Sequence, residues 1–141
     1  MKKTITVILS MFILLSFLTV ATADSPYSSE SVTSYRYIGL YNASTNLSIT
    51  GNTARCNGSA FAKSPNYSLK VTLSLQKSMN GSWSTIVSWK GTGTGYVGVV
   101  LSEASSGLSS GTYRCKMYVR VYDSNGIFVE SSTVFSQTCS I

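Results

Sequence analysis

The chain has 141 residues, with 11 Lys and Arg side chains against 5 Asp and Glu, and it contains no histidine. A single domain is expected at this length. The absence of imidazole excludes a His-based catalytic triad and His-ligated metal sites. Five carboxylates and three cysteines leave little material for any other active site. We therefore predict a protein that is not an enzyme and that uses no cofactor and no metal.

Residues 1–23 have the pattern of a secretory signal peptide. Lys2 and Lys3 precede an uncharged apolar stretch over residues 5–20, and Ala21-Thr22-Ala23 matches the small-residue cleavage site. The alternative is an uncleaved anchor helix, but the apolar stretch is short for a membrane span of about 20 residues. We expect a cleavable signal helix and a secreted, extracellular product.

Cleavage would leave 118 of the 141 residues, and the loss of Lys2 and Lys3 would leave nine basic and five acidic side chains, a net charge of +4. No second apolar run of about 18 residues follows, so no membrane span is expected in the mature chain. Residues 24–34 are rich in serine and lack an apolar period, which is typical of a flexible lead. Residues 35–141 are predicted to form the folded domain.

The mature chain alternates between apolar and polar residues in many short segments, and this period of two predicts β-strands. The clearest segment is 67–77, where the apolar residues at alternate positions are Tyr67, Leu69, Val71, Leu73 and Leu75. Residues 91–95 are predicted to be a flexible Gly/Thr break, and residues 102–111 a polar loop that could hold one helical turn. The predicted strands are 35–41, a short one at 47–49, 53–62, 67–77, 83–89 (with Trp83, Thr85, Val87 and Trp89 on one face), 96–101, 112–122 and 127–138. Seven or eight short strands without a helix predict a two-layer all-β sandwich.

Two hairpins can be checked for register. In each, the residues predicted to face the core have odd numbers on both strands, so an odd number of loop residues is required to pair them. Three-residue loops at 79–81 and 124–126 meet this requirement with a type I turn followed by Gly in the left-handed region. A two-residue Asn-Gly turn is the alternative. The predicted features are positive φ at Gly81 and Gly126, Leu73 opposite Val87, Val121 opposite Val129 and Cys115 opposite Phe135.

The segment Gly111-Thr112-Tyr113-Arg114-Cys115 resembles the G-x-Y-x-C segment of immunoglobulin domains. In that family the Tyr forms the tyrosine corner and the Cys pairs with a Cys on an earlier strand. Cys56 lies 59 positions upstream, so the resemblance implies an immunoglobulin-like antiparallel sandwich with a Cys56–Cys115 disulfide, which secretion would favour. The alternative is three buried thiols. With the disulfide formed, Cys139 is left over as a free thiol or for an intermolecular bond.

The wider pattern also resembles a poorly characterised group of small secreted proteins from Gram-positive gut bacteria (gut Firmicutes). The similarity covers about residues 37–138 and implies an immunoglobulin-like β-sandwich without an activity to transfer. The segments that carry it are Leu75-Gln76-Lys77, Asn80-Gly81-Ser82-Trp83, Val87-Ser88-Trp89, Tyr113-Arg114 and Val121-Tyr122.

The acidic side chains form no recognisable acid/base pair for glycoside hydrolysis. Asp123 lies in a predicted hairpin turn, where a local hydrogen bond accounts for it. Asp24 and Glu30 lie in the lead, Glu103 in a polar loop and Glu130 on the last strand. A small hydrolase is therefore not favoured.

One strand face has binding potential. If the even-numbered side chains of residues 112–122 meet solvent, they form a cationic and aromatic stripe about 27 Å long, at roughly 3.4 Å per residue. Its candidate binding residues are Arg114, Lys116, Tyr118, Arg120 and Tyr122. The plainer alternative is a solvated sheet face. Rings can stack on sugars, and Arg or Lys can meet anionic cell-wall polymers.

We therefore predict a secreted, non-enzymatic binding protein for glycans or anionic cell-wall polymers, with no nucleic-acid partner. The alternatives are a small secreted toxin or bacteriocin-like effector, and self-assembly through exposed strand edges or Cys139.

Overall fold

The computed structural model describes residues 37–141, which belong to one compact unit. These residues form an all-β fold, as predicted. The predicted signal peptide, residues 1–23, and lead, residues 24–34, lie outside the described residues. The eight strands are β1 (Leu40–Thr50), β2 (Thr53–Ala62), β3 (Ser68–Met79), β4 (Ser82–Thr94), β5 (Val99–Ser105), β6 (Thr112–Tyr122), β7 (Phe128–Phe135) and β8 (Cys139–Ser140).

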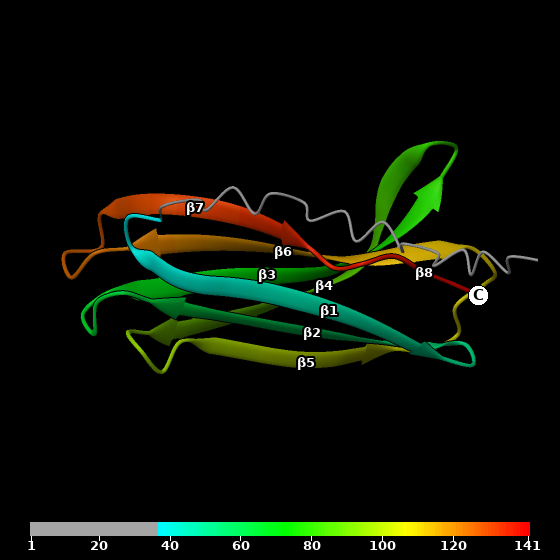
Figure 1. Cartoon of the computed structure of the whole chain (residues 1–141), viewed down its shortest axis with the longest axis horizontal. Helices are drawn as coiled ribbons and strands as arrows, with labels where there is room; N and C mark the ends of the chain where they lie inside the picture. The colour runs from blue at the N-terminus through cyan, green and yellow to red at the C-terminus, as the bar shows by residue number, and fades with distance from the viewer. Residues whose placement is uncertain (1–36) are drawn as a thin grey trace, which may run out of the picture. The chain divides into compact units, whose positions relative to one another are not determined.

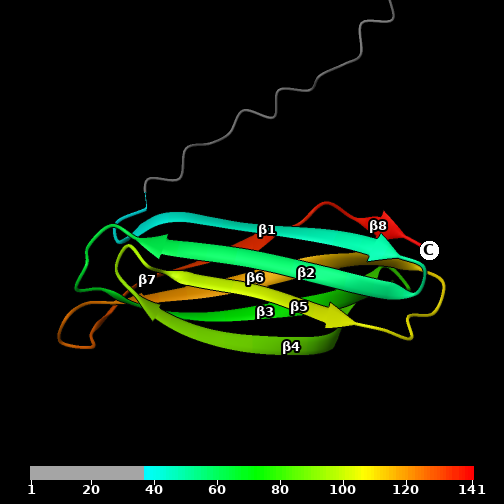
Figure 2. The same cartoon turned by 90° about the horizontal axis from the view of Figure 1, so that it is seen from below.

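The strands form two antiparallel sheets, which are stacked as two layers (Figures 1 and 2). The first, called sheet A here, has the strand order β1-β2-β5. The second, called sheet B, has the order β4-β3-β6-β7, and the short β8 pairs with the start of β6. The predicted two-layer sandwich is therefore confirmed for this part of the chain.

The core lies between the layers and is built from the period-two alternation of the strands. The inward residues of β3 and β6 are almost completely buried, while their neighbours in sequence point outward. Burying a Val or Leu side chain stabilises a fold by about 1.5–3 kcal/mol, so these two central strands anchor sheet B. The buried set on β3 and β6 is Leu69, Val71, Leu73, Leu75, Tyr113, Cys115, Met117, Val119 and Val121.

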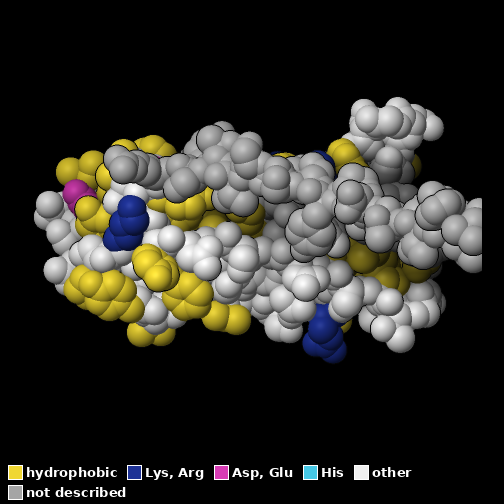
Figure 3. All heavy atoms as spheres, viewed as in Figure 1, with side chains coloured by type: hydrophobic (Ala, Val, Ile, Leu, Met, Phe, Trp, Pro, Cys, Tyr) yellow, Lys and Arg dark blue, Asp and Glu magenta, His cyan; other side chains and the backbone are white. Residues whose placement is uncertain are grey.

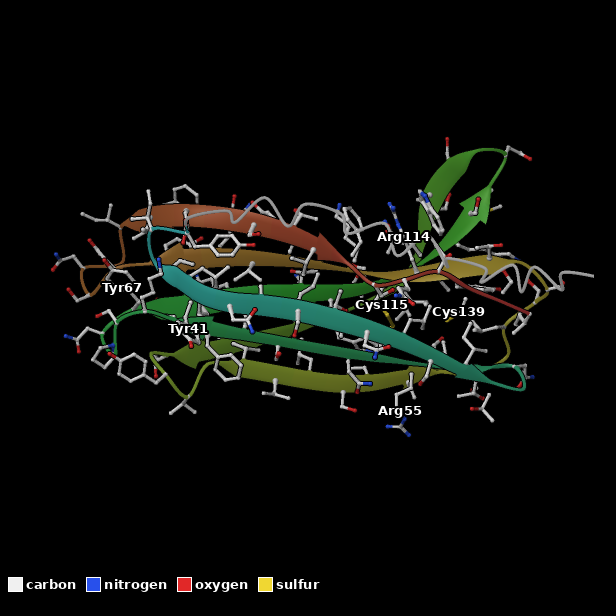
Figure 4. The ribbon with its side chains drawn as sticks, in the orientation of Figure 1. Tyr41, Arg55, Tyr67, Arg114, Cys115 and Cys139 are labelled. Carbon is white, nitrogen blue, oxygen red and sulfur yellow. A yellow bond between two sulfur atoms is a disulfide. The ribbon has the colours of Figure 1, made fainter. Side chains whose placement is uncertain are left out.

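A disulfide joins the two layers. Cys56 on β2 and Cys115 on β6 are bonded, with a Cα–Cα distance of 6.2 Å, as predicted (Figure 4). Cys139 keeps a free thiol that is partly buried, and its Sγ lies 3.6 Å from the carbonyl oxygen of Leu47. The covalent link therefore joins the two sheets through the core, and the third cysteine is left as a thiol.

The β3–β4 hairpin differs from the prediction. Met79 pairs with Ser82, so the turn is the two-residue Asn80-Gly81, with φ of 50° and 79°. Both central residues have positive φ, which is the pattern of a type I′ turn. The positive φ at Gly81 is confirmed, but the three-residue loop is wrong.

A β-bulge inside β4, and not the loop, brings odd-numbered residues of β3 opposite odd-numbered residues of β4. Leu75 pairs with Val87 and Gln76 with Thr85, which leaves Ile86 as the extra residue. Leu73 consequently opposes Trp89 instead of Val87. The four odd-numbered residues of β4 do not share a face, because the bulge turns Trp83 and Thr85 to the outer side of sheet B while Val87 and Trp89 pack on the core.

The β6–β7 hairpin has the predicted three-residue loop. The amide of Asp123 donates to the carbonyl of Ile127, the amide of Gly126 donates to the carbonyl of Asp123, and Gly126 has φ of 77°. A bulge at Val129 then shifts the register, so Val121 opposes Glu130. The predicted pair of Val121 with Val129 is therefore wrong.

The same one-residue shift continues along β7. Phe135 pairs with Lys116, and Cys115 exchanges hydrogen bonds with Ser136 instead of opposing Phe135. Phe135 is thereby placed on the outer side of sheet B.

The limits of other strands also differ from the predicted ranges. The segments predicted separately at 35–41 and 47–49 are one strand from residue 40 onward, β1. The predicted break at 91–95 lies largely within β4. Gly91 and Gly93 have no side chains, so β5 and the residues just before it can pack closely against β4 at these two positions. A Cβ at Gly93 would lie 1.9 Å from the carbonyl oxygen of Gly98. The strand predicted at 96–101 begins only at Val99 and continues into the predicted loop at 102–111.

Candidate binding face

The five predicted binding residues lie on the outer side of sheet B, on its interior strand β6. Arg120 is exposed, and the other four are partly exposed. They are Arg114, Lys116, Tyr118, Arg120 and Tyr122. We call these residues, with the outward side chains of β3, β4 and β7 beside them, the cationic face.

The register brings two further cations to this face. Lys70 on β3 is directly opposite Arg120, and Thr72 is directly opposite Tyr118. On the other side of β3, Lys90 pairs with Thr72 and Thr92 with Lys70. Lys70, Lys90 and Arg120 therefore come from three adjacent strands and lie close together on exposed positions.

Carboxylates are not among the outward residues of the face. Within residues 37–141 there are three acidic side chains, and each is placed elsewhere. Glu130 accepts hydrogen bonds from the amides of residues 38–40, and Asp123 accepts them from the amides of Asn125 and Ile127 inside its turn. Glu103 lies on β5 of sheet A. The positive charges of the face are therefore without a neighbouring counter-charge on the same surface.

Arg114 is held between two aromatic rings. Its guanidinium carbon lies 4.2 Å from the ring centroid of Trp83 on β4 and 4.1 Å from that of Phe135 on β7. Its Nε donates to Oε1 of Gln76 at 2.9 Å. Burial lowers the pKa of Arg114 from its ordinary value. Figure 4 shows Arg114 at the base of the projecting β3–β4 hairpin. Stacking of this kind organises the face and leaves Arg114 less free for a ligand than the other cations.

Tyr118 and Arg120 form a second cation–aromatic contact. The Arg120 guanidinium carbon lies 5.3 Å from the Tyr118 ring centroid, and its Nε donates to the phenolic oxygen at 3.2 Å. Hydrogen bonds from Ser131 and then from Arg120 lower the pKa of Tyr118, and the same bond to Tyr118 raises the pKa of Arg120. These contacts fix the Arg120 side chain against the Tyr118 ring.

A shallow pocket of about 320 Å³ opens among these side chains. It lies over β3, β4 and β6 and is bounded by the three clustered cations and a tyrosine ring. The lining residues are Lys70, Val71, Thr72, Lys90, Gly91, Thr92, Tyr118 and Arg120.

Among the described residues, a neighbouring hollow of about 350 Å³ extends over β3 and β4 beside Lys70, and two others lie away from this face. A larger one, of about 480 Å³, lies on sheet A among Ser, Thr and Asn side chains without a charge. The other, of about 360 Å³, is lined by Tyr41, Phe61, Ala62 and Tyr96. Figure 3 shows hydrophobic side chains gathered at one end of the face in view, and Figure 4 places Tyr41 at the same end. Neither of these two hollows has a Lys or Arg side chain in its lining. The pocket over β3, β4 and β6 is therefore the better candidate binding site, although it is not the largest of them.

The sequence pattern missed part of the face. Lys70 and Lys90 are on polar positions that alternation alone could identify, but their proximity to Arg120 follows from the strand order. Trp83 and Phe135 were missed because each is turned outward after a β-bulge.

No helix in the described part of the chain is long and apolar enough to cross a membrane. Within residues 37–141, no group of three His, Cys, Asp or Glu side chains could hold a metal ion.

Comparison with known proteins gives no family for the chain. No family model matches it, and no curated protein matches it significantly. The chemistry of the cationic face is therefore the basis for assigning a function.

Proposed function

We propose that the chain is an exported, non-enzymatic protein that binds glycans or anionic cell-wall polymers through the cationic face. The observation that carries this proposal is the gathering of five of the eight basic side chains of residues 37–141 on the outer side of sheet B, without an acidic neighbour. Aromatic rings interleave with these cations, and such a surface attracts polyanions and offers stacking area to sugar rings.

Export is supported by the signal-like sequence of residues 1–23 and by the Cys56–Cys115 disulfide, since disulfides persist in oxidising compartments. We propose that the sandwich is immunoglobulin-like and related to small secreted proteins of Gram-positive gut bacteria. The immunoglobulin-like assignment is supported by the disulfide between the second and sixth strands and by the hydrogen bond from the Tyr113 hydroxyl to the Ser109 carbonyl, which is the contact of a tyrosine corner. The proposed relationship to the gut-bacterial proteins rests on the sequence resemblance alone.

The test is a binding assay with the Arg120→Ala/Tyr122→Ala double variant against purified cell-wall polymers and a glycan panel. We expect at least a fivefold loss of affinity, because the double variant removes a cation and a ring from the exposed end of the face. Arg55→Ala removes one exposed positive charge from the outer side of sheet A and is the matched control (Figure 4). Unchanged binding by the double variant would reject the face.

A further inference from the structure

We propose that the pocket over β3, β4 and β6 is a subsite for a phosphate-type oxyanion, carried as a phosphodiester on a linear polymer. This inference rests on the proposed binding function and names its ligand class. The residues that would hold the anion are Lys70, Lys90 and Arg120, with the hydroxyls of Thr72 and Thr92 beside them.

The first argument is electrostatic. Lys70 and Arg120 are directly opposite each other on neighbouring strands. Such a pair has its Cβ atoms about 5 Å apart, and like charges in this position destabilise a sheet. Lys90 adds a third positive charge one strand away. The ammonium of Lys70 lies 4.9 Å from the ring centroid of Tyr122, so the ring accounts for part of this charge. The outward positions of these strands carry no carboxylate, so an anion bound from solution would relieve the remaining repulsion.

The second argument is geometric. Donors reach the pocket from three strands, because Lys90 lies on β4, Lys70 on β3 and Arg120 on β6. A carboxylate is planar and presents two oxygens, which one bidentate Arg can satisfy. A tetrahedral phosphate group presents oxygens in several directions, and convergent donors of this kind match it better. The guanidinium of Arg120 is bonded to Tyr118 through Nε and also to the Tyr122 hydroxyl, so the other N–H groups of its terminal nitrogens remain for the anion.

The third argument concerns the length of the ligand. The cations continue along β6 beyond the pocket, since Lys116 follows on the same outward side four residues from Arg120. At roughly 3.4 Å per residue this separation is about 14 Å. A linear polymer with repeated anionic groups could therefore contact the pocket and Lys116 together, whereas a single free phosphate could not.

The experiment measures binding of the exported chain to poly(glycerol phosphate) and to polygalacturonate, matched in charge and ionic strength, by titration calorimetry. We expect poly(glycerol phosphate) to bind at least fivefold more tightly. Lys70→Ala/Lys90→Ala should reduce that affinity at least tenfold while changing polygalacturonate binding less than threefold. Arg55→Ala should change either affinity less than twofold. Both lysines are exposed, so thermal unfolding of the variant should match that of the wild type.

Three further probes distinguish the sources of a phosphate group. Inorganic phosphate, vesicles containing phosphatidylglycerol and a single-stranded oligonucleotide should each bind more weakly than poly(glycerol phosphate). Tighter binding of any of them would overturn the polymer assignment. An equal loss for both polymers in the lysine variant, or an equal loss with Arg55→Ala, would overturn the subsite but leave the proposed function standing. Loss of the proposed function itself would instead appear as no binding of any polymer or glycan by the wild type.

Discussion

The phenolic hydroxyl of Tyr113 donates a hydrogen bond to the carbonyl oxygen of Ser109, at 2.5 Å. The Tyr113 ring is buried beside the disulfide cysteine of β6, whereas Ser109 lies in the exposed segment that leads into this strand. The ammonium of Lys77 lies 5.4 Å from the same ring centroid. The bond therefore fastens the connection between β5 and β6 to the core.

Replacing this hydroxyl tests its contribution to stability. Tyr113→Phe keeps the ring and removes the donor, so we expect the free energy of unfolding to fall by about 0.5–1.5 kcal/mol, the net contribution of a typical hydrogen bond. Chemical denaturation measures the change. Tyr41→Phe is the matched control because that tyrosine is 72% exposed, and we expect a change within about 0.5 kcal/mol. Equal losses in the two variants would contradict the role of the bond.

The disulfide gives a second prediction. It joins residues 59 positions apart, and in the chain-entropy model closing a loop of this length stabilises the fold by about 4 kcal/mol. The Cys56→Ala/Cys115→Ala double variant should lose stability of this order, measured by denaturant unfolding. Cys139→Ala should lose much less, because its thiol is free. The mass of the purified chain without reductant should correspond to one disulfide, and a mass for three free thiols would reject the bond.

Two glycines with positive φ form a matched pair for a third prediction. Gly98 has φ of 66° and Gly107 has φ of 75°. A Cβ at Gly98 would lie 2.3 Å from the Ala60 carbonyl oxygen, whereas a Cβ at Gly107 would have no atom within 4 Å.

Gly107→Ala should therefore cost about 1–2 kcal/mol from the left-handed backbone alone. Gly98→Ala should cost a further 1–3 kcal/mol, roughly, because β2 and the β4–β5 connection must separate. Thermal unfolding of the two variants measures the difference. Similar melting temperatures would show that the close approach at Gly98 is relaxed without cost.

Alternation predicted the strands and their buried faces well where it was uninterrupted. The limits of β2 and β6 match the predicted ranges, and the inward set of β6 is the predicted one. The disulfide was also confirmed. A period of two is a local signal, and each of these features depends on residues within one strand or on a family resemblance.

The errors arose where one extra residue in a strand, a β-bulge, reverses which side of the sheet the side chains beyond it face. The bulge at Ile86 turns Trp83 outward, and the bulge at Val129 does the same for Phe135. A bulge leaves no clear mark in an alternating sequence, because the pattern on each side of it is still regular. The environment of Arg114 depends on both bulges, so its stacking between two rings could not be derived from the sequence.

That stacking gives the last prediction. Arg114→Ala removes the cation between Trp83 and Phe135 and leaves Oε1 of the buried Gln76 without its donor, so we expect a loss of about 1–3 kcal/mol. Arg120→Ala is the matched control on the same strand and face, and because Arg120 is exposed its cost should stay within about 0.5 kcal/mol.

Fluorescence reports the same contact directly. The chain has two tryptophans, so in a Trp89→Phe background the emission comes from Trp83 alone. Arg114→Ala should shift this emission to longer wavelength as water replaces the guanidinium over the ring, and Arg120→Ala should leave it unchanged. An unshifted spectrum for Arg114→Ala, with stability equal to that of Arg120→Ala, would show that Arg114 is a free surface cation and would return it to the set available for ligand binding.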